Sequence, residues 1–499
     1  MNELRIAIPP GRQGFDVEQA GGNGDFHRLA YARLFVYPPT IDPATGAAIG
    51  DVSRLEGQLA AGWEVSADGR VYRVTLRRGV VSPFGNELTA EDVCWGWERA
   101  FGLRDVGKWV AIVGSVTGPE SVVAVDRYTV EFRLRAANPT LLHQLTRSTP
   151  TIYDSTEARR HATPDDPWAK AWLAAQPAGF GSYALIRHSQ WTEVIFDAHE
   201  GGVVRPSFDR IRFIIVPGRR TRLNLLRDGA IDLLLDLNPA EAQTLRDADG
   251  VHVLASRSGS HVALMLNCQQ APFDNPLVRR AIAWATPYDR IRNEVYRGTA
   301  AAWRSPFPWP TPGATDQFWD YDYDLDRARA ALAEAGLRDG FATEVFIDAA
   351  NREHEACAEI VAESLGRLGI DVAIERLDSS TFWFGGRYVR PFPMLIWEDW
   401  HQVPDPYYAL VHDYDASRLG LINCGQYHSE RIAQLIPRIE NEPRWEARAA
   451  LLREAQAVIA ADSPNVQLAQ PAVFAAARAE IGGLFFPPDR ALRYELLHR

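Results

Sequence analysis

Alternating hydrophobic and polar residues predict β-strands in the first third of the chain. In residues 70–77, Tyr72, Val74 and Leu76 occupy every second position, as the buried face of a half-buried strand requires. The same alternation returns in residues 121–134, which predict a hairpin. A sheet with one buried face is therefore expected in this part of the chain.

An amphipathic helix is predicted between these strands, over residues 89–101. Thr89 is a suitable N-cap, and two acidic residues follow in the first turn, where the helix dipole favours negative charge. One face of the helix carries Val93, Trp97 and Ala100. We expect this face to pack on the predicted sheet.

Strand–helix–strand order appears in the middle of the chain and predicts parallel pairing. An apolar strand at 211–216 is followed by a helix that ends near Gly229, and a strand resumes at 231–237. Further on, Asn275 and Pro276 have the pattern of an N-cap and first residue of another helix.

The clearest strand–helix–strand unit covers residues 343–374. Its helix is apolar at Cys357, Val361 and Leu365 and is expected to stop at Gly369. Two such regions without a linker between them favour lobes joined by crossing strands.

The composition limits the classes of function. The chain has 499 residues, so two or three lobes are expected, and its formal net charge is −11. A nucleic-acid partner is disfavoured, because proteins that bind nucleic acids usually carry a basic surface. Only Lys108 and Lys170 are lysines, so arginine clusters such as 219–222 are weak evidence for anion binding.

The sequence contains no apolar run of the roughly 20 residues that cross a bilayer. Residues 1–10 lack the charged and apolar regions of an export signal and predict the first strand of a mature domain. Either the protein is cytoplasmic, or an export signal has been removed from it.

Signatures of metal, redox and catalytic sites are missing from the sequence. No cysteine pair has C-x-x-C spacing; Cys94 and Cys357 are expected to be buried thiols, and Cys268 and Cys424 would pair only in an oxidising compartment. No catalytic elbow, zincin or phosphate-loop motif is present. Alternating aspartates in 320–326 predict turn and cap chemistry. We therefore predict no cofactor, no metal site and no enzyme activity.

Aromatic residues are concentrated in residues 381–408. Aromatic rings with a few charged groups are what a solute pocket needs, whereas the alternative is core packing at a lobe boundary. The candidate ligand-binding residues in this segment are Trp383, Arg387, Arg390, Trp397, Glu398, Asp399, Trp400, His401 and Tyr407.

Several segments match one family pattern in the same order along the chain. Residues 59–101 carry Leu-Ala-x-x-Trp, an Asp-Gly turn, a strand ending in Leu-Arg and a Leu-Thr-Ala-Glu-Asp-Val helix start. Further matches lie at 177–185, 223–237, 266–291 and 404–406. The chain resembles the family 5 extracellular solute-binding proteins of ABC importers, which include oligopeptide, dipeptide, nickel and opine binders.

The resemblance implies an α/β, two-lobed periplasmic-binding-protein fold of type II, in the large class that has an extra subdomain inserted in lobe I. Lobe I would cover residues 1–258 and 470–499, with the inserted subdomain at about 42–165. Lobe II would cover residues 259–469. Solute binding would favour closure of the two lobes.

The resemblance also implies where the solute binds. Peptide-binding members carry an acidic residue three positions after the strand tryptophan, for the ligand α-amino group. If that tryptophan is Trp397, this chain has Trp400 there, and Glu398 and Asp399 are displaced. Ordinary peptide binding is therefore in question, and the extra ring could stack on another solute. The candidate contacts from lobe I are Tyr37 and Trp109.

The expected partners are a small solute (an oligopeptide, opine, oligosaccharide or metal chelate) and the permease subunits of an ABC transporter. Docking on a membrane permease implies a periplasmic or extracytoplasmic location. We expect a monomer that binds no nucleic acid. Two other classes remain open: a sensor that binds a solute and signals to a receptor, and a hydrolase that uses paired carboxylates such as Asp399 and Asp405.

Overall fold

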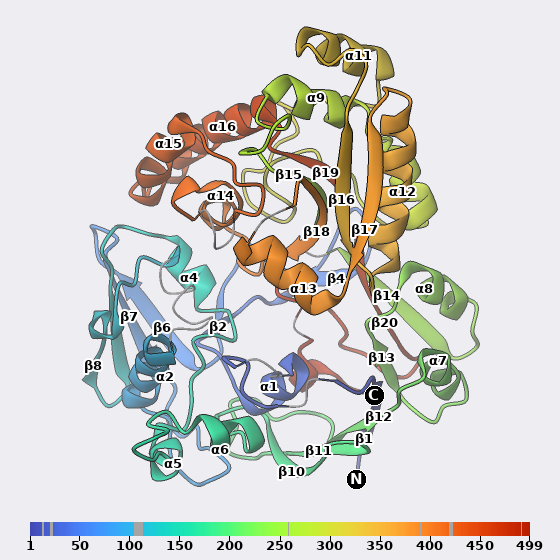
Figure 1. Cartoon of the computed structure of the whole chain (residues 1–499). Helices are drawn as coiled ribbons and strands as arrows, with labels where there is room; N and C mark the ends of the chain where they lie inside the picture. The colour runs from blue at the N-terminus through green and yellow to red at the C-terminus, as the bar shows by residue number, and fades with distance from the viewer. Residues whose placement is uncertain are drawn as a thin grey trace. The chain divides into compact units, whose positions relative to one another are not determined.

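The computed structural model describes residues 1–11, 14–19, 23–103, 113–257, 259–389, 392–418, 423–490 and 492–499 (Figure 1). The chain divides into two compact units. Unit 1 contains Met1–Ser256 and Val473–Arg499, and unit 2 contains Arg257–Ala472. Among the described residues, no helix is both long enough and apolar enough to cross a membrane.

Unit 1 is built on a seven-stranded sheet with the order β10-β11-β12-β1-β13-β20-β14. Its strands are β1 (Glu3–Ile8), β10 (Tyr183–Ser189), β11 (Glu193–Ala198), β12 (Arg210–Ile215), β13 (Leu233–Leu235), β14 (Val251–Arg257) and β20 (Ala472–Arg478). The N-terminal segment forms β1, as predicted. β12 and β13 are parallel, also as predicted, but each pairs with β1, which lies between them.

A second, four-stranded sheet in unit 1 has its own hydrophobic core. It is formed by β6 (Ala60–Val65), β7 (Val71–Leu76), β8 (Val122–Asp126) and β9 (Thr129–Arg133). Tyr72, Val74 and Leu76 are buried, whereas Arg73 and Thr75 between them are exposed, so the predicted alternation is confirmed. Helix α2 (Ala90–Leu103) packs against β8 and β9.

The start of α2 follows the predicted capping chemistry in modified form. Asp92, at the third helical position, accepts hydrogen bonds from both the backbone N–H and the hydroxyl of Thr89, at 2.7 and 2.9 Å. The remaining elements of unit 1 are α1 (Gly24–Ala30), β2 (Phe35–Val36), β3 (Pro39–Ile41), β4 (Ala48–Gly50), β5 (Glu56–Gly57), η1 (Pro119–Ser121), α4 (Thr140–Gln144), α5 (Ser155–Arg160), α6 (Lys170–Ala175), α7 (Arg219–Arg227), α8 (Pro239–Arg246) and η5 (Tyr494–Leu496).

Unit 2 has a five-stranded mixed sheet with the order β17-β16-β18-β15-β19. Its strands are β15 (Ser260–Leu266), β16 (Ala342–Asp348), β17 (Asp371–Leu377), β18 (Met394–Trp400) and β19 (Asn465–Ala469). β16, α12 (Arg352–Gly366) and β17 form the predicted unit with parallel strands. Gly369 follows with φ of 79°, a left-handed conformation that suits glycine.

Helices cover this sheet, and α12 lies along β16 and β17 (Figure 1). Asn275 caps α9 (Pro276–Trp284), as predicted. Asp324 caps α11 (Leu325–Glu334), which confirms the prediction that the aspartates in 320–326 include a helix cap. The other elements of unit 2 are α10 (Tyr288–Arg290), η2 (Ile291–Val295), α13 (Ser379–Phe384), η3 (Gly385–Val389), α14 (Pro406–Tyr414), η4 (Ala416–Arg418), α15 (Glu430–Glu440) and α16 (Trp445–Asp462).

A buried ionic network ties α2 to the N-terminal segment of unit 1. The Arg99 guanidinium, fully buried on α2, pairs with Asp16, with Glu18 at 2.9 Å and with the Tyr153 hydroxyl at 2.7 Å. Charges removed from water in this way are tolerated only while they remain paired. We therefore expect this network to be sensitive to the loss of any one partner.

Replacing Arg99 with methionine should lower the free energy of unfolding by about 3–5 kcal/mol, because the buried carboxyl groups of Asp16 and Glu18 would lose their cationic partner. Urea unfolding followed by circular dichroism measures the change. The matched control is Arg54→Ala, which breaks an exposed ion pair with Glu56 and should cost less than about 0.5 kcal/mol. An equal effect of the two substitutions would contradict the assignment.

The same network predicts a pH dependence of stability. Desolvation raises the pKa of Glu18 from 4.5 to about 7, against the opposing charge of Arg99. Between these values the folded chain binds more protons than the unfolded chain, so the free energy of unfolding should fall as the pH rises, by about 3 kcal/mol at most. Glu18→Gln cannot ionise, so its unfolding curves from pH 4.5 to 7.5 should show a shallower fall; an unchanged slope would contradict this origin.

Candidate functional site

Strand β18 carries the centre of the aromatic segment and distributes its side chains over two faces. β18 pairs antiparallel with β15, from Ser260 opposite Trp400 to Leu266 opposite Met394, and parallel with β16. Because successive side chains of a strand point to opposite faces, Trp397 lies on one face and Glu398 on the other. The candidate residues therefore do not form a single surface.

Trp397 belongs to a hydrophobic cluster. Its side chain is 1% exposed, and its ring lies 5.7 Å from Phe382 and 4.5 Å from Trp383 on α13. Trp383 itself is partly buried. Trp397 is therefore a core residue, and core packing is the alternative to a solute pocket that the sequence left open for this segment.

Asp399 and His401 are also buried. The Asp399 carboxylate accepts hydrogen bonds from the Trp400 backbone N–H at 2.8 Å and from the Trp397 indole N–H at 3.4 Å. The ring of His401 lies edge-on to that of His261, with 4.6 Å between centroids. These two candidate residues face the interior of unit 2.

Glu398 and Trp400, on the opposite face of β18, are both partly exposed. The Glu398 side chain is 28% exposed, and its carboxylate lies 4.0 Å from Nε2 of His354 in the first turn of α12. Burial lowers the pKa of His354, against the opposing charge of Glu398, so its imidazole is neutral near pH 7. Glu398 is thus the accessible carboxylate of the candidate segment on this face.

The carboxyl ends of β16, β17 and β18 lie at the same edge of the sheet because these strands are parallel. The N-termini of α12 and α13 follow β16 and β17 directly. In α/β sheets, this edge is where ligands usually bind. Glu398 and Trp400 therefore stand at the position that the sheet favours for a solute.

The other candidate residues have different surroundings. Tyr407 is 4% exposed at the start of α14, and Tyr37 of unit 1 is 3% exposed, with its hydroxyl 2.7 Å from Nδ1 of His143. Arg387 lies in η3, and nothing is described of its side chain. Trp109 and Arg390 lie outside the described residues.

Asp405, one of the paired carboxylates considered for a hydrolase, has a structural role. It caps α14 by accepting the Tyr407 N–H at 2.8 Å and binds the buried Arg448 guanidinium at 2.9 and 3.0 Å. A carboxylate with both oxygens engaged in this way is poorly placed for proton transfer. No disulfide joins any two cysteines among the described residues, so Cys268 and Cys424 are not bonded to each other, a pairing that the sequence left open.

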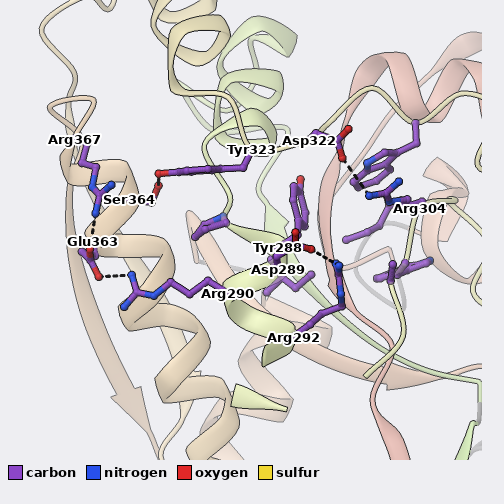
Figure 2. A pocket seen from close by; sticks show the side chains of 16 residues that line it. Tyr288, Asp289, Arg290, Arg292, Arg304, Asp322, Tyr323, Glu363, Ser364 and Arg367 are labelled. Carbon is purple, nitrogen blue, oxygen red and sulfur yellow. Dashed lines mark hydrogen bonds and ion pairs between the residues drawn. The ribbon is translucent and has the colours of Figure 1, made fainter. Parts of the chain in front are cut away.

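A pocket of about 490 Å³ lies elsewhere in unit 2, between α10, η2 and α12 (Figure 2). Figure 2 shows Glu363 between Arg290 and Arg367, with contacts of 2.5 and 2.8 Å, and Arg304 pairs with Asp322 at 3.2 Å. The sequence did not predict this pocket, because its residues come from distant segments; Arg290 and Glu363 are separated by 73 positions. Its arginines are paired with carboxylates, so an anionic ligand would have to displace these contacts.

Residues 54–419 match the family described as bacterial extracellular solute-binding proteins, family 5. The chain belongs to this family. Family 5 proteins bind solutes outside the cytoplasm for ABC transporters, so this chain is a transport component and not an enzyme. The resemblance inferred from the collinear segments is thereby confirmed.

Relatives of the chain carry different solutes in their names. It is 26% identical to heme-binding protein A of Haemophilus influenzae, over 87% of this chain and 82% of the relative. It is also 26% identical to the dipeptide-binding protein of Escherichia coli, over 88% of this chain and 85% of the relative. The family is clear, whereas the solute differs among the relatives.

Solved structures confirm the two-lobed α/β periplasmic-binding-protein fold. DppA from Helicobacter pylori, in complex with the peptide STSA, matches with a TM-score of 0.84 and 24% identity over 99% of this chain and 98% of that chain. NikZ from Campylobacter jejuni, in complex with Ni(L-His), matches with a TM-score of 0.78 and 17% identity over 99% of this chain and 97% of that chain.

The two tryptophans of β18 should respond differently to substitution. Trp397→Ala should lower the free energy of unfolding by about 3–5 kcal/mol because it leaves a cavity among packed rings. Trp400→Ala, at the partly exposed end of the strand, should cost less than half as much. Thermal and urea unfolding of the two variants measure the difference, and equal destabilisation would show that Trp400 is also a core residue.

Proposed function

We propose that this family 5 protein captures a small peptide-like solute with Glu398 and Trp400, and delivers it to an ABC permease. The solute would carry a cationic amine for Glu398 and an apolar or aromatic group for Trp400. The observation that supports this assignment is that both side chains are partly exposed on one face, at the edge where β16, β17 and β18 end.

The side chains at this edge are two residues apart on one strand, so they point the same way with roughly 7 Å between their Cα atoms. That spacing suits an amine and a neighbouring side chain of one small molecule. A tryptophan replaces the acidic residue that the family resemblance predicts three positions after Trp397. The proposed solute therefore depends more on ring contact than an ordinary dipeptide does.

The partners follow from the same assignment. The proposed permease receives the solute from a monomeric binding protein, and nucleic acid has no part in the function, in keeping with the net charge of −11. A solute sensor would use the same binding residues. Solute uptake that depends on both this protein and a permease would distinguish transport from sensing.

The decisive experiment is isothermal titration calorimetry on protein freed of co-purified solute by unfolding and refolding. The panel contains short peptides with free and acetylated N-termini, opines and oligosaccharides. We expect peptide-like ligands with a free amine and an aromatic side chain to bind, and N-acetylation to weaken binding at least about 10-fold because it removes the charge that Glu398 contacts.

Substitutions locate the site. Trp400→Ala and Glu398→Gln should each weaken binding about 10-fold or more, whereas Glu355→Gln on α12 and Arg304→Ala in the separate pocket should leave it unchanged. Binding that depends on Arg304 and not on Glu398 would move the site to the pocket of Figure 2. Binding of an oligosaccharide alone would refute the peptide-like class.

A further inference from the structure

Three side chains from distant parts of unit 2 place metal-ligating atoms close together. His261 on β15, His401 after β18 and Asp413 on α14 each offer one ligand atom, and these atoms lie within 4.8 Å of one another. We propose that His261, His401 and Asp413 bind one divalent transition-metal ion of the zinc type. Two imidazoles and a carboxylate are a donor set that suits such ions.

The hydrogen bonding of His261 leaves one nitrogen available to a metal. Its Nδ1 lies 3.0 Å from the carbonyl oxygen of Gly259, and because a carbonyl cannot donate, Nδ1 carries the proton. The lone pair of His261 is therefore on Nε2. Metal-bound histidines are typically oriented in this way, by donation from the other ring nitrogen to a carbonyl or carboxylate.

His401 is buried, and its Nδ1 has no hydrogen-bond partner in the described part of the chain. Its Nε2 lies 3.1 Å from Oδ2 of Asp413. Two ligands of a tetrahedral zinc ion, each about 2.0–2.1 Å from the metal, are about 3.3 Å apart. The separation of these two atoms thus fits neighbouring ligands that point at a common ion.

The second oxygen of Asp413 is held in place by a further histidine. Nδ1 of His412 lies 2.7 Å from Oδ1 of Asp413, and Nε2 of His412 lies 3.7 Å from Oδ2 of Asp399. This chain of contacts orients the Asp413 carboxylate and leaves Oδ2 toward His401. Such outer contacts are characteristic of metal-ligating carboxylates.

Aromatic rings pack against the two histidines of the cluster. The ring of Trp303 lies 4.7 Å from that of His261, and the ring of Tyr408 lies 5.5 Å from that of His401. His261 and His401 are each 1% exposed, and the Asp413 side chain is 6% exposed.

Three protein ligands would leave a coordination position for water or another small ligand. The alternative is a metal-free network in which His401 and Asp413 contact each other directly.

Metal binding to tag-free protein, stripped with a chelator and dialysed, tests the proposal without any solute. We expect calorimetry to give one Zn²⁺ per chain, and Co²⁺ to give the visible absorption of a four-coordinate site. Mg²⁺ should not bind, since it prefers oxygen ligands. No Zn²⁺ binding by the natural sequence would overturn the proposal and leave the proposed solute function untouched.

Single substitutions distinguish this cluster from other zinc sites. His261→Ala and Asp413→Asn should weaken Zn²⁺ binding at least about 100-fold, and His412→Ala by about 10–100-fold through loss of the outer contact. The control is His161→Gln, an exposed histidine of unit 1 that should bind as the natural sequence does. Melting curves without metal show whether each variant folds, and Zn²⁺ binding unchanged in folded His261→Ala and Asp413→Asn would refute the site.

Discussion

The pairing of β15 with β18 is the constraint on which both the proposed solute site and the proposed metal site depend. The two strands match residue for residue from Ser260 and Trp400 to Leu266 and Met394. Because strand side chains alternate between faces, a slip of one residue would move every side chain of β18 to the other face. This register sends Trp397 into the core and leaves Glu398 and Trp400 at a partly exposed edge.

The register also brings buried histidines together. His261 lies opposite Asp399 in the ladder, and His401 follows the last residue of β18. The ring of His401 packs against Tyr408 and His412 of α14. Helix α14 is oriented by the buried ion pair of Asp405 with Arg448, which holds the helix start. Asp413 lies two turns further along the same helix. The Asp405–Arg448 ion pair therefore helps to place Asp413 beside the histidines.

Ionic contacts have different roles where they are buried and where they are exposed. In unit 1, the buried guanidinium of Arg99 joins α2 to the N-terminal segment and stabilises the packing of distant parts of the chain. In the pocket of unit 2, the ion pairs of Glu363 with Arg290 and Arg367 are partly exposed, and each contributes little to the free energy of unfolding. Loss of one partner is therefore costly for the buried pairs, because it leaves an unpaired charge in the interior, and costs little for the exposed pairs.

The sequence by itself determined the family, the two α/β regions and most of their elements. The alternation of Tyr72, Val74 and Leu76 and the helix before Gly369 could be read because local periodicity depends only on near neighbours. Only the tertiary structure decided that β1 separates β12 from β13, that Trp397 is a core residue and that Asp405 caps a helix. The physical reason is that these facts depend on long-range pairing, in which residues far apart in the chain, such as those that join β15, β18 and α14, meet only after the fold has formed.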